Sequence, residues 1–362
     1  MARRARFAAQ NSYDRAGRIG NIGLIWIAVA LLAAVVLAGA VYQALGIAKD
    51  ARRFPAPGRF IHVGTHRLHA QLSENPGPTV LFEAGIGSSS VSWALVRQQL
   101  SGIARVCAYD RAGLGWSDAA RTPRTLENIL SDLRALATHS EISRPIVLVG
   151  HSFGGLVALE YACRYREELA GLVLVDPLAA SEWHPLTVED ARRLARGVTL
   201  ARRGALLARL GVVRFALALL TRGSRRIPKM FARISSGNGA PLTERILGEV
   251  GKLPPEAWPI IQAHWCQPKS FLGMADHLEN LPRNAAQCSA DCDLGDLPLI
   301  VLSAVDSSPV RLDEHERMAK LSRQGRWALA KKSGHWIQLD QPELVVSAIR
   351  EVIGMARVNT RA

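Results

Sequence analysis

The stretch that decides the fold is Val149-Gly150-His151-Ser152-Phe153-Gly154-Gly155, which carries a G-x-S-x-G pattern. The apolar run PIVLVG leads into it, and FGGLVALEYACRY, with helical spacing, follows it. A serine between a strand and a helix sits on a sharp turn, which needs the small neighbours Gly150 and Gly154. The pattern predicts an exposed, nucleophilic Ser152. The N–H of Phe153, at the start of the helix, is then a candidate oxyanion donor. A plain glycine-rich turn is the alternative.

Around this stretch, short apolar runs alternate with helical patterns. Strands are expected at 59–63, 67–72, 79–85, 104–110, 145–150, 171–176, 297–303 and 327–332. Such alternation is typical of a mostly parallel sheet with helices on both faces, which is the α/β class. The rhythm breaks between Ser181 and Gln287, where the pattern is helical throughout. We interpret this segment as a helical cap insertion.

A second oxyanion donor is expected in the loop after the third strand. That loop reads Glu83-Ala84-Gly85-Ile86-Gly87. Its two glycines allow the backbone to approach a substrate closely, and the N–H of Ile86 is the candidate donor. The alternative is an ordinary strand-to-helix turn.

With these motifs in order, the chain resembles the α/β-hydrolase family, which includes esterases, lipases and proline iminopeptidases. The resemblance covers about Arg59 to Ile353, apart from the cap insertion, and rests on EAGIG (83–87), YDRAGLGWSD (109–118), GHSFGG (150–155), LVLVDP (172–177) and SGHWIQLDQPE (333–343). It implies the α/β-hydrolase fold and acyl transfer to water through a Ser152 acyl-enzyme. Relatives that cleave epoxides or carbon–halogen bonds carry aspartate at the nucleophile position, so Ser152 argues against that chemistry.

The resemblance also identifies the base. His335, between the last strand and the last helix, matches the family's catalytic histidine in motif and chain position. An imidazole takes up and returns a proton near neutral pH. Two acids at strand ends can complete a triad: Asp176, the last residue of GLVLVD, and Asp306, after LPLIVLSAV. We favour Asp176, because its position needs no shift, and keep Asp306 as the alternative.

The N-terminal region has the composition of a membrane anchor. No charged residue occurs from Ile19 to Ala48, and a bilayer core takes about 20 apolar residues in a helix. A cleaved signal peptide is the alternative. Arginines are denser before this run than after it, which predicts a single-pass protein with its catalytic domain on the extracytoplasmic side.

The cap insertion is strongly basic. Twelve Arg or Lys residues fall between Ala191 and Arg233, interleaved with apolar residues. This pattern is typical of cationic amphipathic helices that rest on anionic lipid. A helical lid with its arginines in water is an equal alternative.

The overall charge of +14 is compatible with nucleic acid as a partner, but no nucleic-acid-binding motif is found and none is expected. Among the five cysteines, Cys107 and Cys163 are predicted to be small buried residues. Free thiols are expected for the other three, with one disulfide among them as the alternative. Their spacing does not suit a zinc site, and neither a metal nor an organic cofactor is expected.

These observations divide the chain into six segments. They are a basic tail (1–18), a transmembrane helix (19–48), a linker (49–58), a first hydrolase part (59–180), the cap insertion (181–287) and a second hydrolase part (288–362). The expected reaction is hydrolysis of a small-molecule ester with an apolar acyl or alcohol group. The alternatives are an amidase, peptidase or carbon–carbon bond hydrolase on the same triad, or a binding protein without activity.

Overall fold

The computed structural model of the chain contains one eight-stranded sheet with the order β1-β2-β4-β3-β5-β6-β7-β8. It describes residues 2–75, 77–221, 251–289 and 292–359, with side chains in the first helix from Leu24 onward. The strands are β1 (Arg59–Val63), β2 (His66–Leu72), β3 (Thr79–Glu83), β4 (Arg105–Tyr109), β5 (Ile146–His151), β6 (Leu169–Val175), β7 (Leu299–Ala304) and β8 (Gly325–Ala330).

The described sheet has two antiparallel pairs, β1 with β2 and β2 with β4. All its other neighbouring strands, from β4 through β3, β5, β6 and β7 to β8, are parallel. This confirms the predicted α/β class with a mostly parallel sheet. Because parallel strands end at one edge, the segments that follow β5, β6 and β8 meet there.

Helices cover both faces of the sheet and form two separate cores. One face packs against α3 (Leu126–Ala137), α4 (Phe153–Arg164) and α11 (Pro309–Ala319), and the other against α2 (Ala94–Gln99) and α13 (Pro342–Asn359). The strands between them are buried on both sides, as in β5, where every residue is buried. The rigid sheet therefore gives the residues at its edge fixed positions.

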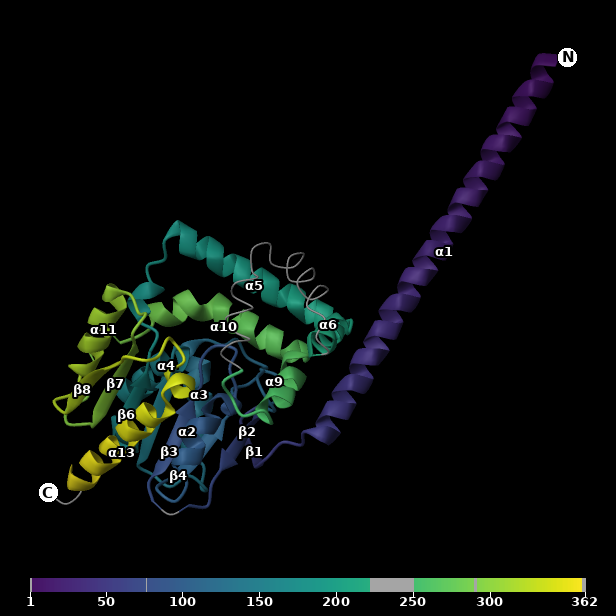
Figure 1. Cartoon of the computed structure of the whole chain (residues 1–362). Helices are drawn as coiled ribbons and strands as arrows, with labels where there is room; N and C mark the ends of the chain where they lie inside the picture. The colour runs from purple at the N-terminus through teal and green to yellow at the C-terminus, as the bar shows by residue number, and fades with distance from the viewer. Residues whose placement is uncertain (1, 76, 222–250, 290–291, 360–362) are drawn as a thin grey trace.

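Between β6 and β7 lie α5 (Val188–Arg209), α6 (Val212–Thr221), α9 (Ala257–Trp265) and α10 (Pro268–Ala286). The buried residues of α5 follow helical spacing and face α10, and the two helices run side by side (Figure 1). They are Val198, Ala201, Ala205 and Ala208. The basic residues predicted at 222–233 lie outside the described residues, and the limits of the cap insertion stay a prediction.

Helix α1 (Ala2–Arg53) is longer than the predicted transmembrane helix and extends away from the domain (Figure 1). Residues 49–53, predicted as linker, continue the helix. They contain no glycine or proline, and Pro55 follows where the helix has ended. Within the described residues, one helix, from Leu24 to Arg53, is long and apolar enough to cross a membrane.

Candidate active site

Ser152 occupies the turn between β5 and α4 with a φ of +55°, a conformation that costs energy for any residue with a side chain. The glycines beside it allow the close packing of this turn. A Cβ on Gly150 would lie 2.4 Å from the carbonyl oxygen of Gly154, and one on Gly154 equally close to that of Glu83. The G-x-S-x-G spacing thus follows from the contacts of the turn.

His335 lies between β8 and α12 (Ile337–Asp340) and contacts Ser152. Its Nε2 is 3.1 Å from Oγ of Ser152, and its Nδ1 is 2.6 Å from Oδ2 of Asp176. In this arrangement the imidazole can accept the hydroxyl proton at Nε2 while Nδ1–H donates to the carboxylate. The three residues come from three different strand ends.

Asp176 follows β6 directly and is fully buried, with a φ of +40°. Its Oδ1 accepts hydrogen bonds from the Ala304 N–H at 2.9 Å and from Oγ of Ser307 at 3.0 Å. Burial alone would raise its pKa. The hydrogen bond and charge of His335 and the Ala304 N–H outweigh burial and lower the pKa of Asp176 to about 2. The carboxylate is therefore ionised at neutral pH.

Asp306, the alternative acid, is exposed on the segment after β7. Its Oδ2 lies 3.3 Å from the position of a Cβ on Gly334, next to His335 in the chain. The Nδ1 atom of His335 is already taken by Asp176, so the geometry favours Asp176.

The loop that carries Ile86 lies against Ser152. A Cβ added to its neighbour Gly85 would be 3.5 Å from the Cβ of Ser152. In the described part of the chain, the N–H groups of Ile86 and Phe153 have no protein acceptor. Arg111 fixes the loop by donating to the carbonyls of Ala84 and Gly85 and to the carboxylate of Glu83. Two backbone donors are thus available beside the serine.

Asp110, directly after β4, holds neighbouring segments together through its carboxylate. Its carboxylate accepts from the N–H of Ser90 at 2.7 Å, from the N–H of Trp116 at 3.0 Å and from His69 at 2.9 Å. One buried side chain therefore holds two loops together.

His151 precedes Ser152 but does not compete with His335 as its base. The His151 side chain is buried, and its Nε2 donates to the carbonyl oxygen of His335 at 2.9 Å. Burial, with the charge of His335, lowers the pKa of His151 to about 3. It is therefore a neutral side chain that supports the segment carrying His335.

One covalent link was not predicted. Cys163 on α4 forms a disulfide with Cys292, so the prediction that both are unpaired is wrong. The two are 129 residues apart in sequence, and only the fold brings the end of α4 beside the segment before β7. Cys107, Cys266 and Cys288 are free thiols.

Arg311 on α11 is another neighbour of the site that the sequence did not single out. It donates to both carboxylate oxygens of Glu182, at 2.8 and 3.0 Å, and its Nη1 lies 3.8 Å from Oδ2 of Asp176. Arginine is common on helices, so no sequence signal marked it.

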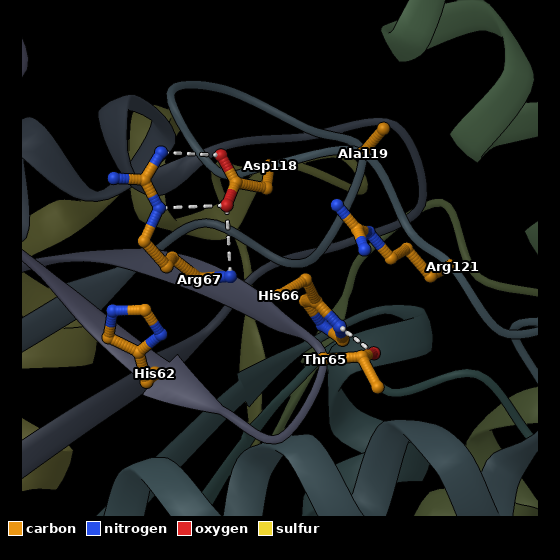
Figure 2. Close-up of a pocket in the computed structure, with 7 residues that line it drawn as sticks. All are labelled: His62, Thr65, His66, Arg67, Asp118, Ala119 and Arg121. Atoms are coloured by element: carbon orange, nitrogen blue, oxygen red, sulfur yellow. Dashed lines mark hydrogen bonds and ion pairs between the residues drawn. The ribbon is translucent and has the colours of Figure 1, made fainter.

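Figure 2 shows the residues around a surface hollow that none of these catalytic candidates lines. The volume of the hollow is about 520 Å³. It is bordered by His62, Thr65, His66, Arg67, Asp118, Ala119 and Arg121. Arg67 is joined to Asp118 by three hydrogen bonds, two from its guanidinium and one from its backbone N–H, and His66 is hydrogen-bonded to Asp132. Neither here nor in the rest of the described chain do three or more His, Cys, Asp or Glu side chains form a group that could hold a metal ion.

The model of the alpha/beta hydrolase fold matches residues 78–342, and the chain belongs to this family. It is therefore classed as a hydrolase. An uncharacterized protein of Bacillus subtilis is 34% identical over 112 residues, which are 31% of this chain and 44% of that protein. The chain thus spans less than half the length of that relative.

Solved structures with the same fold include an esterase from Thermogutta terrifontis, at 25% identity and a TM-score of 0.55. The match covers 82% of this chain and 98% of the esterase. A putative epoxide hydrolase from Pseudomonas aeruginosa matches with a TM-score of 0.61 over 83% of this chain and 96% of its own. Its identity is 16%, so this likeness concerns the fold alone.

Proposed function

We propose that the chain is a membrane-tethered serine hydrolase that cleaves esters of an apolar acyl or alcohol group through a Ser152 acyl-enzyme. The observation that carries this proposal is the hydrogen-bonded series from Ser152 through His335 to Asp176. The two free N–H groups beside Ser152 support it, because acyl transfer needs donors for a developing oxyanion.

In the first half of the reaction, Oγ of Ser152 attacks the ester carbonyl carbon while its proton passes to Nε2 of His335. The negative oxygen that forms is stabilised by the N–H groups of Ile86 and Phe153 and by the N-terminus of α4. His335 then gives the proton to the departing alcohol oxygen as the ester C–O bond breaks. The acyl group remains on Ser152.

In the second half, His335 removes a proton from water, and the hydroxide attacks the acyl carbonyl. The bond to Oγ of Ser152 then breaks, Oγ regains the proton from His335, and the carboxylic acid leaves. Throughout, the Asp176 carboxylate holds the imidazole orientation and stabilises the imidazolium. No step requires a metal or an organic cofactor.

Esters are favoured over amides by the likeness to the Thermogutta esterase. The apolar character of the substrate is supported by the side chains near His335. Trp336 packs with the apolar cluster of Val91, Leu253, Ala257, Ile261 and Leu339. An apolar group of a small molecule would gain free energy by covering the partly exposed ring of Trp336.

Tethering is supported by α1, in which an 18-residue window of the candidate span has a mean hydropathy of 2.8 and contains no buried residue. The Cys163–Cys292 disulfide supports a catalytic domain on the extracytoplasmic side, because disulfides persist in oxidising compartments. Protease treatment of intact spheroplasts should cut the catalytic domain. A domain that is cut only after lysis would reverse this orientation.

A fluorophosphonate probe tests the catalytic proposal directly. Membranes containing the full chain should show a labelled band that is absent for Ser152→Ala at equal protein level. Labelling that persists in Ser152→Ala, or is absent from both, would contradict it. Matched esters and amides of increasing acyl length would then rank the substrates, with esters expected to turn over faster.

A further inference from the structure

The second half of α1 packs against the turn between α5 and α6, formed by Leu210 and Gly211. A Cβ on Gly39 of α1 would lie 2.4 Å from the carbonyl oxygen of Leu210. A Cβ on Gly211, which has a φ of +72°, would lie 2.9 Å from the ring of Tyr42. Backbone meets backbone here, a contact that only glycine permits.

A polar cluster fixes the same two parts to each other. Gln43 is 3% exposed, donates to the carbonyl of Cys266 at 2.6 Å and accepts from Nε of Arg214 at 3.0 Å. Arg214 also pairs with Asp50 at 2.7 Å, and both side chains are mostly buried. One arginine of α6 thus binds two residues on α1, which gives the helix a defined orientation against the α5–α6 turn.

The depth of this contact in a bilayer follows from helix geometry. An α-helix rises about 1.5 Å per residue, so a hydrocarbon core about 30 Å thick takes about 20 residues. Counted from Ile19, where the uncharged run begins, these end near Ala38. Gly39 and Tyr42 come next, and tyrosine is enriched at the membrane interface. The α5–α6 turn that touches them therefore lies at interfacial depth.

The side chains exposed around this turn are of the kinds that favour the membrane interface. Helix α6 reads VVRFALALLT, and its Phe215 is 51% exposed. On the last turns of α5, Leu206 is exposed as well, next to the exposed Arg203 and Arg209. Large apolar side chains beside cationic ones are typical of helices that lie in the plane of an anionic membrane surface.

We propose that the α5–α6 turn and α6 are seated in the interfacial layer of an anionic lipid bilayer, oriented there by their contacts with α1. This inference rests on the membrane tether of the proposed function and adds a second contact with the same bilayer. The occupant of the surface is lipid, because the surface is continuous with a membrane-spanning helix and carries the complementary charge. The helices α5 and α6 are then held at the membrane, rather than at the end of a free tether.

A depth measurement tests this on the full chain in liposomes. A Cys288→Ser background removes the partly exposed thiol, since Cys107 and Cys266 are buried. An environment-sensitive fluorophore is attached to Phe215→Cys. The matched control is Val310→Cys, at a position that is 64% exposed. It lies on α11, a helix far from α1 in Figure 1. Lipids with a nitroxide near the headgroup should quench the label at 215 severalfold more than the label at 310.

Stronger quenching in liposomes with phosphatidylglycerol than with phosphatidylcholine alone would support the anionic partner. Equal quenching at positions 215 and 310 would overturn the inference. Gly39→Val, which adds bulk where the two backbones meet, should reduce quenching at 215, and unchanged quenching would contradict the orienting role of α1. Fluorophosphonate labelling of Ser152 is read in the same samples, so failure of the hydrolase proposal is distinguished from failure of membrane contact.

Discussion

Oδ2 of Asp176 lies 2.6 Å from Nδ1 of His335, although the two residues are 159 positions apart in the sequence. Each residue follows a strand of the same parallel sheet, Asp176 after β6 and His335 after β8, with β7 between the two strands. Because parallel strands end at the same edge of the sheet, the two side chains meet there although they are far apart in the sequence. The contact is also what distinguishes Asp176 from Asp306.

Replacing Asp176 with Asn should lower kcat by a factor on the order of 10⁴, because the amide no longer holds the imidazole in the productive tautomer. Asp306→Asn, the matched control at an exposed position, should retain turnover close to wild type. Steady-state kinetics with one activated ester compares the two. A large loss in Asp306→Asn with little loss in Asp176→Asn would reverse the assignment.

Gly154→Ala should both destabilise the fold and impair the site. Its Cβ would lie 2.4 Å from the Glu83 carbonyl oxygen, on backbone that cannot move without shifting β3. Gly354→Ala in α13 is the control, since no atom lies within 4 Å of its added Cβ and alanine favours the helix by up to about 1 kcal/mol. Thermal unfolding should show opposite signs for the two variants. A Gly154→Ala protein as stable and active as wild type would refute the packing argument.

Removal of the Cys163–Cys292 disulfide should cost about 2–5 kcal/mol of unfolding free energy, since it closes a long loop in the unfolded chain. Cys163→Ser with Cys292→Ser is compared with Cys288→Ser, which removes a thiol that forms no disulfide. Denaturant unfolding, with and without reductant, provides the measurement. Reductant should destabilise wild type and leave the double variant unchanged.

Acid should weaken the junction between α9 and the core through His264. Burial holds the pKa of His264 at about 4, below its ordinary 6.5, so the folded state favours the neutral ring. At a pH between these two pKa values, His264 binds a proton in the unfolded chain but not in the folded protein. The free energy of unfolding therefore falls as the pH decreases through this range. His264→Gln should therefore lose less stability than wild type from pH 7 to pH 4.

His62→Gln, at an exposed position, serves as the control for this pH series. Its loss of stability on acidification should follow wild type. The same loss in His264→Gln as in wild type would count against the role of the buried ring, which packs edge-on against Trp116 with ring centroids 4.5 Å apart.

The fold and the centre of the site could be predicted because their signals are local. The glycine spacing around Ser152 reflects contacts within one turn, and the alternation of strands and helices reflects burial on both faces of a sheet. The segment order then allowed His335 to be found by resemblance. The sheet topology and the family match confirm the class of fold, and the catalytic roles stay predictions.

Other features depend on distant segments and had no local signal. The pairing of Cys163 with Cys292 needs the fold, since cysteine spacing gives no connectivity. The choice between two strand-end aspartates depends on the path of a loop. The bond between Gln43 and Arg214 joins an apolar helix to a segment 171 residues later, which composition does not reveal.

The polar cluster on α1 has a practical consequence for producing the protein. A chain shortened to begin at Phe54 would lose Gln43 and Asp50, leaving the mostly buried guanidinium of Arg214 without its carboxylate and the Cys266 carbonyl without its donor. The surface of the α5–α6 turn that α1 covers would also be exposed to water, and an exposed apolar surface promotes aggregation. A chain beginning near Gly39 keeps both partners and removes most of the apolar run. The expression boundary therefore belongs inside the helix rather than at its end.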